Sequence, residues 1–282
     1  MPTLKITIDI FSGRPNPVIE LSGAEAREAS ALLKAKRQAD TRDPRPLPVP
    51  TLGYRGLIIE TPDSRRREPI RTTDPALEDF ICGSTGALKR FGLGKEFPQI
   101  LRKEIDRYRE LRLRWPHRRI PWPVRLRCRC APLYEPLWWN DGAQRQLQNN
   151  CYNYACNYRT DTFRQIPGGS QPGAAAGAMY TSLTCASVRP AAVADGLIAK
   201  PSANNKCPAE GHLVALVIAP GYDFHWYRKG RNGYWTHKPG STPVINVDNS
   251  SQLIADPRTA DRGMYTQFCT FMVVMHGHIK IK

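Results

Sequence analysis

The chain of 282 residues has no apolar run long enough to cross a membrane, since no stretch approaches eighteen apolar residues. Its first residues, MPTLKITIDIF, alternate apolar and polar side chains and do not follow the order of a secretory signal. No repeat with a fixed period occurs, which excludes collagen, coiled coils and repeat arrays. We therefore expect a globular protein, with the cytoplasm as its default location.

Cysteine is scarce, because eight residues in a chain of this length do not indicate a disulfide scaffold. In a reducing compartment the thiols would be free, which leaves packing, metal binding or catalysis as their roles. In an oxidising compartment Cys156 could pair with another cysteine, and the sequence does not decide the connectivity. The candidate partners are Cys185, Cys207 and Cys269.

Motifs for metals and cofactors are missing as well. The Cys128–Cys130 pair has no second ligand pair at zinc-finger spacing, and His276 and His278 have no evident third ligand. Phosphate-binding loops, dinucleotide fingerprints and G-x-S-x-G elbows do not occur in the sequence. We expect neither a metal ion nor a cofactor.

Charge is strongly one-sided, with 41 Lys and Arg against 25 Asp and Glu, for a net charge of +16. Residues 102–130 hold eleven basic and three acidic side chains, so this run supplies +8, half of the excess. Such a run either binds a polyanion or forms a solvated linker. Its prolines argue against a continuous recognition helix. The candidate polyanion contacts are Arg112, Arg114, Arg118, Arg119, Arg125, Arg127 and Arg129.

The pattern of elements predicts the α+β class, with a small N-terminal α+β unit over residues 1–115. A basic, proline- and arginine-rich linker is predicted over 116–130, and a second domain over 131–282. In the first unit the predicted elements are strands over 4–11 and 56–60, and helices that start at Ser22 and Asp74 or span 95–112.

In the second domain the dipeptide Asn232–Gly233 predicts a hairpin between the segments DFHWYR and YWTHK. The apolar run HLVALVIAP predicts the preceding strand, and one or two strands are expected near the C-terminus. A Gly- and Ala-rich stretch, IPGGSQPGAAAGAM, predicts an irregular loop.

One constellation in this domain could carry chemistry. Asn149 and Asn150 are good N-caps, so a helix is predicted with Cys151 in its first turn. There the helix dipole would lower the thiol pKa, and free N–H groups could stabilise an oxyanion. His225 and His237 lie on the two hairpin arms, and either could serve as the base. Asn246 or Asp248 could orient that histidine.

The string NNCYNYA resembles the nucleophile-bearing helix start of the papain-like superfamily, closest in character to CHAP amidases and NlpC-type cell-wall peptidases. This resemblance implies a papain-like helix-plus-antiparallel-sheet domain with Cys151 as nucleophile and His225 or His237 as base. The cell-wall families would instead select His212, at the start of the first strand. Papain has Gln six residues before its nucleophile, where this chain has Arg145.

With that Gln missing, Asn150 and Gln146 are the candidate oxyanion or orienting residues near the thiol. A second resemblance covers IDIFSGRPNP and DFHWYR…WTHKPG, which look like segments of a group of uncharacterised microbial proteins. No activity comes with that second likeness.

We therefore expect a cysteine-dependent hydrolase or acyltransferase that acts on an amide or ester bond of a peptide or amide substrate. The alternative is a non-catalytic binding or interaction protein with a related fold. In that alternative, residues 102–130 could bind an anionic surface or a nucleic acid.

Overall fold

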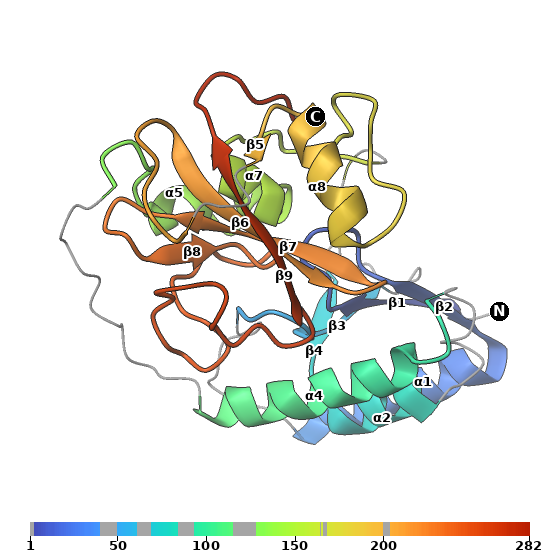
Figure 1. Ribbon diagram of the computed structural model, residues 1–282. Coiled ribbons are helices and arrows are strands. Elements are labelled where there is room, and N and C mark those ends of the chain that lie inside the picture. The colour runs from blue at the N-terminus through green and yellow to red at the C-terminus, as the bar shows by residue number, and fades with distance from the viewer. Residues whose placement is uncertain are drawn as a thin grey trace. The chain divides into compact units, whose positions relative to one another are not determined.

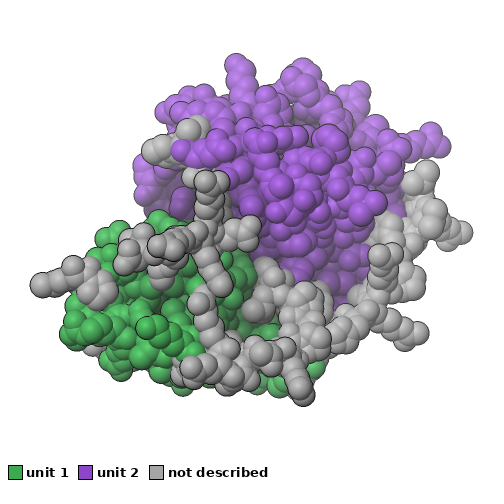
Figure 2. Space-filling model, turned by 180° about the vertical axis from the view of Figure 1, so that it is seen from behind, with its two compact units in different colours: residues 1–10, 16–49, 54–114 green, residues 11–15, 50–53, 115–282 purple. Residues whose placement is uncertain are grey.

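The computed structural model describes residues 3–39, 50–60, 69–83, 93–114, 128–163, 165, 168–199 and 204–282. The chain forms two compact units, which Figure 2 shows in different colours. Unit 1 comprises residues 1–10, 16–49 and 54–114, and unit 2 comprises 11–15, 50–53 and 115–282.

The change of unit after residue 114 lies close to the predicted boundary at 115. Two short segments, 11–15 and 50–53, nevertheless belong to unit 2, and a division by sequence order alone misses them. Hydrogen bonds explain both cases. The backbone N–H of Ser12 donates to the Asp223 carboxylate, and that of Leu52 donates to the Asn249 side chain.

The end of the predicted 116–130 linker is also part of unit 2. Cys128 is buried, forms a disulfide with Cys207, and donates its N–H to the Arg231 carbonyl at 2.9 Å. The basic stretch 115–127 lies outside the described residues.

Unit 1 is an antiparallel sheet with helices, so the α+β prediction is confirmed. Its strand order is β2-β1-β3-β4, α1 packs on β1 and β2, and α2 lies against both α1 and α4 (Figure 1). The predicted strands and helices of this unit are all present. The elements are β1 (Thr3–Asp9), β2 (Val18–Ser22), α1 (Gly23–Ala39), β3 (Gly56–Glu60), β4 (Ile70–Thr72), α2 (Pro75–Gly83) and α4 (Phe97–Arg114).

Asp74 caps α2, because its Oδ1 accepts a hydrogen bond from the Leu77 N–H at 3.0 Å. We expect Asp74→Ala to destabilise this helix by about 1 kcal/mol, since one helix N–H loses its acceptor. Hydrogen exchange of the peptide that covers α2 should speed up about fivefold. The exposed Asp106→Ala is the control, and equal exchange in the two variants would contradict the cap.

Unit 2 is built on a five-stranded antiparallel sheet with the order β5-β9-β6-β7-β8. Helices α7 and α8 contribute to one core cluster with apolar side chains of β6, β7 and β9. A second cluster covers the other face. The elements are α5 (Pro136–Trp139), α6 (Gln144–Leu147), α7 (Cys151–Cys156), α8 (Cys185–Ala194), β5 (Ile198–Ala199), β6 (His212–Ala219), β7 (Asp223–Lys229), β8 (Trp235–His237) and β9 (Gln267–Val274).

The predicted hairpin is β7–β8, and its turn contains Gly233 with a φ of 85°, which glycine adopts without strain. Pairing with β8 begins at Tyr227, opposite His237, so the first half of β7 has no partner in β8. Of the one or two strands predicted near the C-terminus, the structure has one, β9.

Four cysteines form two disulfides, which contradicts the expectation of free thiols. Cys128 pairs with Cys207, and Cys185 pairs with Cys269, with Cα–Cα distances of 5.3 and 5.4 Å. Cys156 stays a buried free thiol, so the suggested pairing with it is wrong. Among the described residues, no helix is long and apolar enough to span a membrane.

Candidate functional site

Helix α7 starts at Cys151, as the Asn pair predicts. The Asn150 Oδ1 accepts from the N–H groups of Tyr152 and Asn153, and the Asn153 side chain accepts from the Asn150 N–H. This reciprocal capping fixes the Cys151 backbone at the first residue of α7. The local sequence therefore contains enough information to place the thiol.

The environment of the thiol differs from the expectation. Burial, reinforced by the nearby Asp223 carboxylate, raises the pKa of Cys151 to about 12. The backbone N–H of Trp226 and the Ser12 hydroxyl act in the opposite direction but do not compensate. The predicted pKa below that of a free cysteine is therefore wrong, because α7 is only six residues long and desolvation outweighs its end effect.

Both hairpin histidines belong to one buried chain of hydrogen bonds. The Ser12 Oγ lies 2.6 Å from His225 Nδ1, and His225 Nε2 lies 2.9 Å from His237 Nδ1. The chain ends at the Val247 carbonyl, 3.0 Å from His237 Nε2. Because Ser12 also contacts the Cys151 thiol, the series runs from the thiol to a backbone carbonyl.

The Val247 carbonyl sets the direction of this chain, because a carbonyl can only accept. His237 Nε2 must carry a proton, and burial lowers the pKa of His237 to about 4, so the ring is neutral. Its Nδ1 then accepts from His225 Nε2–H. When His225 is also neutral, its Nδ1 carries a lone pair that faces Ser12. A base that accepts a proton from the side of the thiol requires this orientation.

Ser12 was missed by the sequence analysis, although it touches both members of the predicted Cys–His pair. Its hydroxyl also accepts from the Gly240 N–H at 3.1 Å. The N–H groups of Ser12, Gly13 and Arg14 all donate to the Asp223 carboxylate. Burial raises the pKa of Asp223 to about 6 in spite of these donors.

Two side-chain amides converge on the Gly13 carbonyl. Asn150 Nδ2 donates to it at 2.8 Å and Gln171 Nε2 at 2.7 Å. Gln171 is itself fixed, since its Oε1 accepts from the Tyr180 hydroxyl at 2.7 Å. The amide orientation follows from that bond. Gln171 was overlooked because it lies in the Gly-rich loop.

Gln146, a predicted oxyanion or orienting residue, is not one of the two side chains that bind the Gly13 carbonyl. It lies on α6 with a half-buried side chain, and its backbone carbonyl accepts from Lys238 Nζ. The two amides on the Gly13 carbonyl come instead from Asn150, which was predicted, and Gln171, which was not.

Asp248 and Asn246 are not the groups that hold the histidine pair. Asp248 accepts from the N–H groups of Ser250, Gln252 and Asp261, so it shapes its own loop. The Asn246 carbonyl accepts from the Ile254 N–H. The contact with His237 comes instead from the carbonyl of the intervening residue, Val247.

His212 lies at the end of α7 away from Cys151. It is fully buried at the first residue of β6. Its Nε2 lies 2.7 Å from the Ala155 carbonyl, at the end of α7 opposite Cys151.

Comparison with known proteins adds a relative. No family model matches the chain, and no solved structure matches it. The chain is 44% identical over 148 residues to "Insoluble matrix shell protein 1" of Ruditapes philippinarum, an alignment that covers 51% of this chain and 91% of that protein. This chain belongs to the family of insoluble matrix shell protein 1. The relative's name describes a shell matrix and states no reaction.

In this member of the insoluble matrix shell protein 1 family, the predicted polyanion contacts are described only in part. Arg112 donates to the Thr73 hydroxyl at 2.6 Å, and Arg129 is exposed. Four of the arginines, and the side chain of Arg114, lie outside the described residues; the four are Arg118, Arg119, Arg125 and Arg127. Within the described parts of the chain, no three His, Cys, Asp or Glu side chains gather at metal-binding distance.

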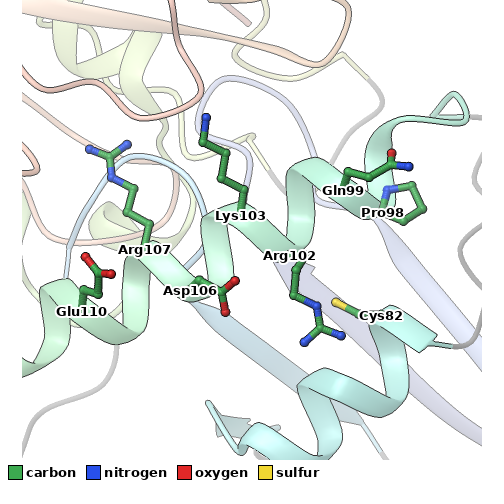
Figure 3. Close-up of a pocket in the computed structure, with 8 residues that line it drawn as sticks. All are labelled: Cys82, Pro98, Gln99, Arg102, Lys103, Asp106, Arg107 and Glu110. Carbon is green, nitrogen blue, oxygen red and sulfur yellow. The ribbon is translucent and has the colours of Figure 1, made fainter.

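A surface pocket in unit 1 is a weaker candidate. Figure 3 shows it between α4 and Cys82, with Arg102 directed toward the thiol. Burial raises the pKa of Cys82 to about 11, and the labelled lining residues include no histidine. Because no histidine lies among the lining residues and the thiol pKa is raised in spite of Arg102, the Cys151 region is the better candidate.

Proposed function

We propose that unit 2 carries a cysteine-dependent hydrolase or acyltransferase site for amide or ester bonds. Cys151 is the nucleophile, His225 is the base, and His237 positions the base. The observation that supports this most directly is the chain from thiol to Val247, whose carbonyl end turns the His225 Nδ1 lone pair toward Ser12 and Cys151.

The reaction follows from these groups. The thiol proton passes to His225 Nδ1, and the thiolate attacks the carbonyl carbon of the substrate. The C–N or C–O bond breaks, and His225 returns the proton to the leaving amine or alcohol. Water or a second amine then releases the acyl group from sulfur. The side-chain amides of Asn150 and Gln171 donate to one carbonyl oxygen, and amides in this position would stabilise the oxyanion.

The arrangement described is a closed state. Cys151, Ser12 and His225 are fully buried, and the raised pKa keeps the thiol protonated. Turnover therefore requires that the Ser12 hydroxyl leave its place between Cys151 and His225.

Acylation by p-nitrophenyl acetate tests this proposal without a known substrate. We expect one acetyl group on Cys151 of the full chain, added during openings of the closed state and located by peptide mass mapping. His225→Ala should slow acetylation by about 10²-fold, because the base is lost, and His237→Gln should slow it less. The exposed His278→Gln should match the unchanged protein. Acetyl groups spread over several residues, or no effect of His225→Ala, would refute the Cys–His pair.

A second candidate is a non-catalytic matrix or binding protein. It is favoured by the relative's name and by the two disulfides, which are typical of oxidising surroundings. The basic run 102–130 would then contact a polyanion. In this case the buried network holds the fold together, and Cys151 stays unmodified in the acetylation experiment.

A further inference from the structure

The segment Phe11–Pro15 bends at Ser12–Arg14, and side chains of unit 2 bind its backbone N–H and C=O groups. Three successive N–H groups, from Ser12 to Arg14, donate to one carboxylate, that of Asp223. The Gly13 carbonyl accepts hydrogen bonds from two side-chain amides, those of Asn150 and Gln171. Both sets of backbone groups are therefore satisfied by buried side chains that surround the thiol.

Residue 13 has no room for a side chain. A Cβ at Gly13 would lie 2.3 Å from the Phe224 ring and 2.5 Å from the Phe224 carbonyl oxygen. The ring could move, but the carbonyl belongs to paired strand β7 and cannot. This position of the bound peptide therefore admits glycine and rejects residues with a Cβ.

The contacts on either side of Gly13 connect this steric rule to the candidate nucleophile. The amide donor on the Gly13 carbonyl is Asn150, the residue directly before Cys151, and the preceding hydroxyl of Ser12 contacts the thiol. The glycyl carbonyl thus lies beside Asn150, the residue that caps the helix start at Cys151.

We propose that Phe11–Pro15 occupies the acyl-binding site of unit 2 as a built-in peptide, and that the site takes peptides with glycine at the acyl position. The proposal rests on the proposed function, whose substrate class it names. Burial by the segment keeps the thiol protonated, so the segment blocks the site and is not cleaved. A substrate reaches Cys151 when the segment is displaced.

Gly13→Ala tests the occupancy. The added methyl group should expel the segment and speed iodoacetamide alkylation of Cys151 by at least ~10-fold, a factor that corresponds to about 1.4 kcal/mol. Gly83→Ala is the matched control, since a Cβ there meets nothing within 4 Å. Arg14→Ala is a milder second variant, because it removes only the bond from Nη1 to the Tyr222 carbonyl and the stacking on Phe11. We expect about a threefold rise for it.

Tryptophan fluorescence should show that each variant is folded. Unchanged alkylation in both Gly13→Ala and Arg14→Ala would overturn the occupancy.

Peptide protection tests the glycine rule by binding alone. Acetyl-Phe-Ser-Gly-Arg-Pro-amide, added to the Gly13→Ala protein, should protect Cys151 from alkylation, and the same peptide with alanine in place of glycine should not. Equal protection, or none, would overturn the inference even when p-nitrophenyl acetate acetylates Cys151. Protection by the glycyl peptide, together with no acetylation of Cys151 in the Gly13→Ala protein, would support the binding site and refute the catalytic function.

Discussion

Replacing Cys185 and Cys269 together with alanine should lower the free energy of unfolding of unit 2 by about 2 to 5 kcal/mol. This disulfide joins the first residue of α8 to β9 across 84 residues of sequence. A cross-link over so long a loop removes many conformations from the unfolded chain, and the lost contact with the apolar cluster adds to the effect.

The measurement is urea unfolding followed by tryptophan fluorescence. All six tryptophans of the chain lie after residue 114, so the signal reports on unit 2 alone. Cys130→Ala, which removes an exposed free thiol, is the control. A double variant with the same urea midpoint as the control would show that the bond is absent or contributes nothing.

The elements that the sequence could predict are those whose cause lies within a few residues. Asn150 and Asn153 cap α7 through contacts at most three residues apart, so the thiol's position at the helix start was predictable. The turn at Gly233 fixed the hairpin in the same way. Alternation along a strand places His225 and Tyr227 on the same side of β7. In the structure the centroids of their rings lie 4.8 Å apart.

The rest of the site depends on contacts between distant parts of the chain. Ser12 meets His225 across 213 residues, and Gln171 meets the Gly13 carbonyl across 158. No local pattern marks either residue, and the segment with Ser12 looks like an ordinary turn cluster. Full burial of the thiol is likewise a property of packing, which is why a helix-end argument gave the wrong direction for its pKa.

The packing also explains why three histidines seemed equivalent in the sequence and are not. Of the three, only His225 contacts Ser12. His237 is hydrogen-bonded to His225, and His212 lies at the end of α7 away from Cys151. Their roles differ because of the neighbours that each ring meets, and those neighbours come from loops and from α7.

Unit 2 should lose stability as the pH falls from 6.5 to 4. Burial lowers the pKa of His212 to about 3 and that of His237 to about 4. Between those values and the ordinary 6.5, the unfolded chain binds protons that the folded chain does not, so acid favours unfolding. Asp223 acts in the opposite direction, because its pKa is raised to about 6 and the folded state holds its proton longer. Burial also raises the pKa of Asp195, which opposes the loss in the same way. The two histidines outweigh these two carboxyls, and we expect a net loss of about 2 kcal/mol.

His212 offers the sharpest check on this expectation. Its Nε2 is bonded to the Ala155 carbonyl, and its Nδ1 has no partner among the described residues, so a second proton would be buried without an acceptor. In His212→Gln, unfolding by urea at pH 6.5 and pH 4, followed by tryptophan fluorescence, should differ by less than about 1 kcal/mol. The exposed His278→Gln should keep the full loss. An equal loss in both variants would mean that His212 is not the source of the acid sensitivity.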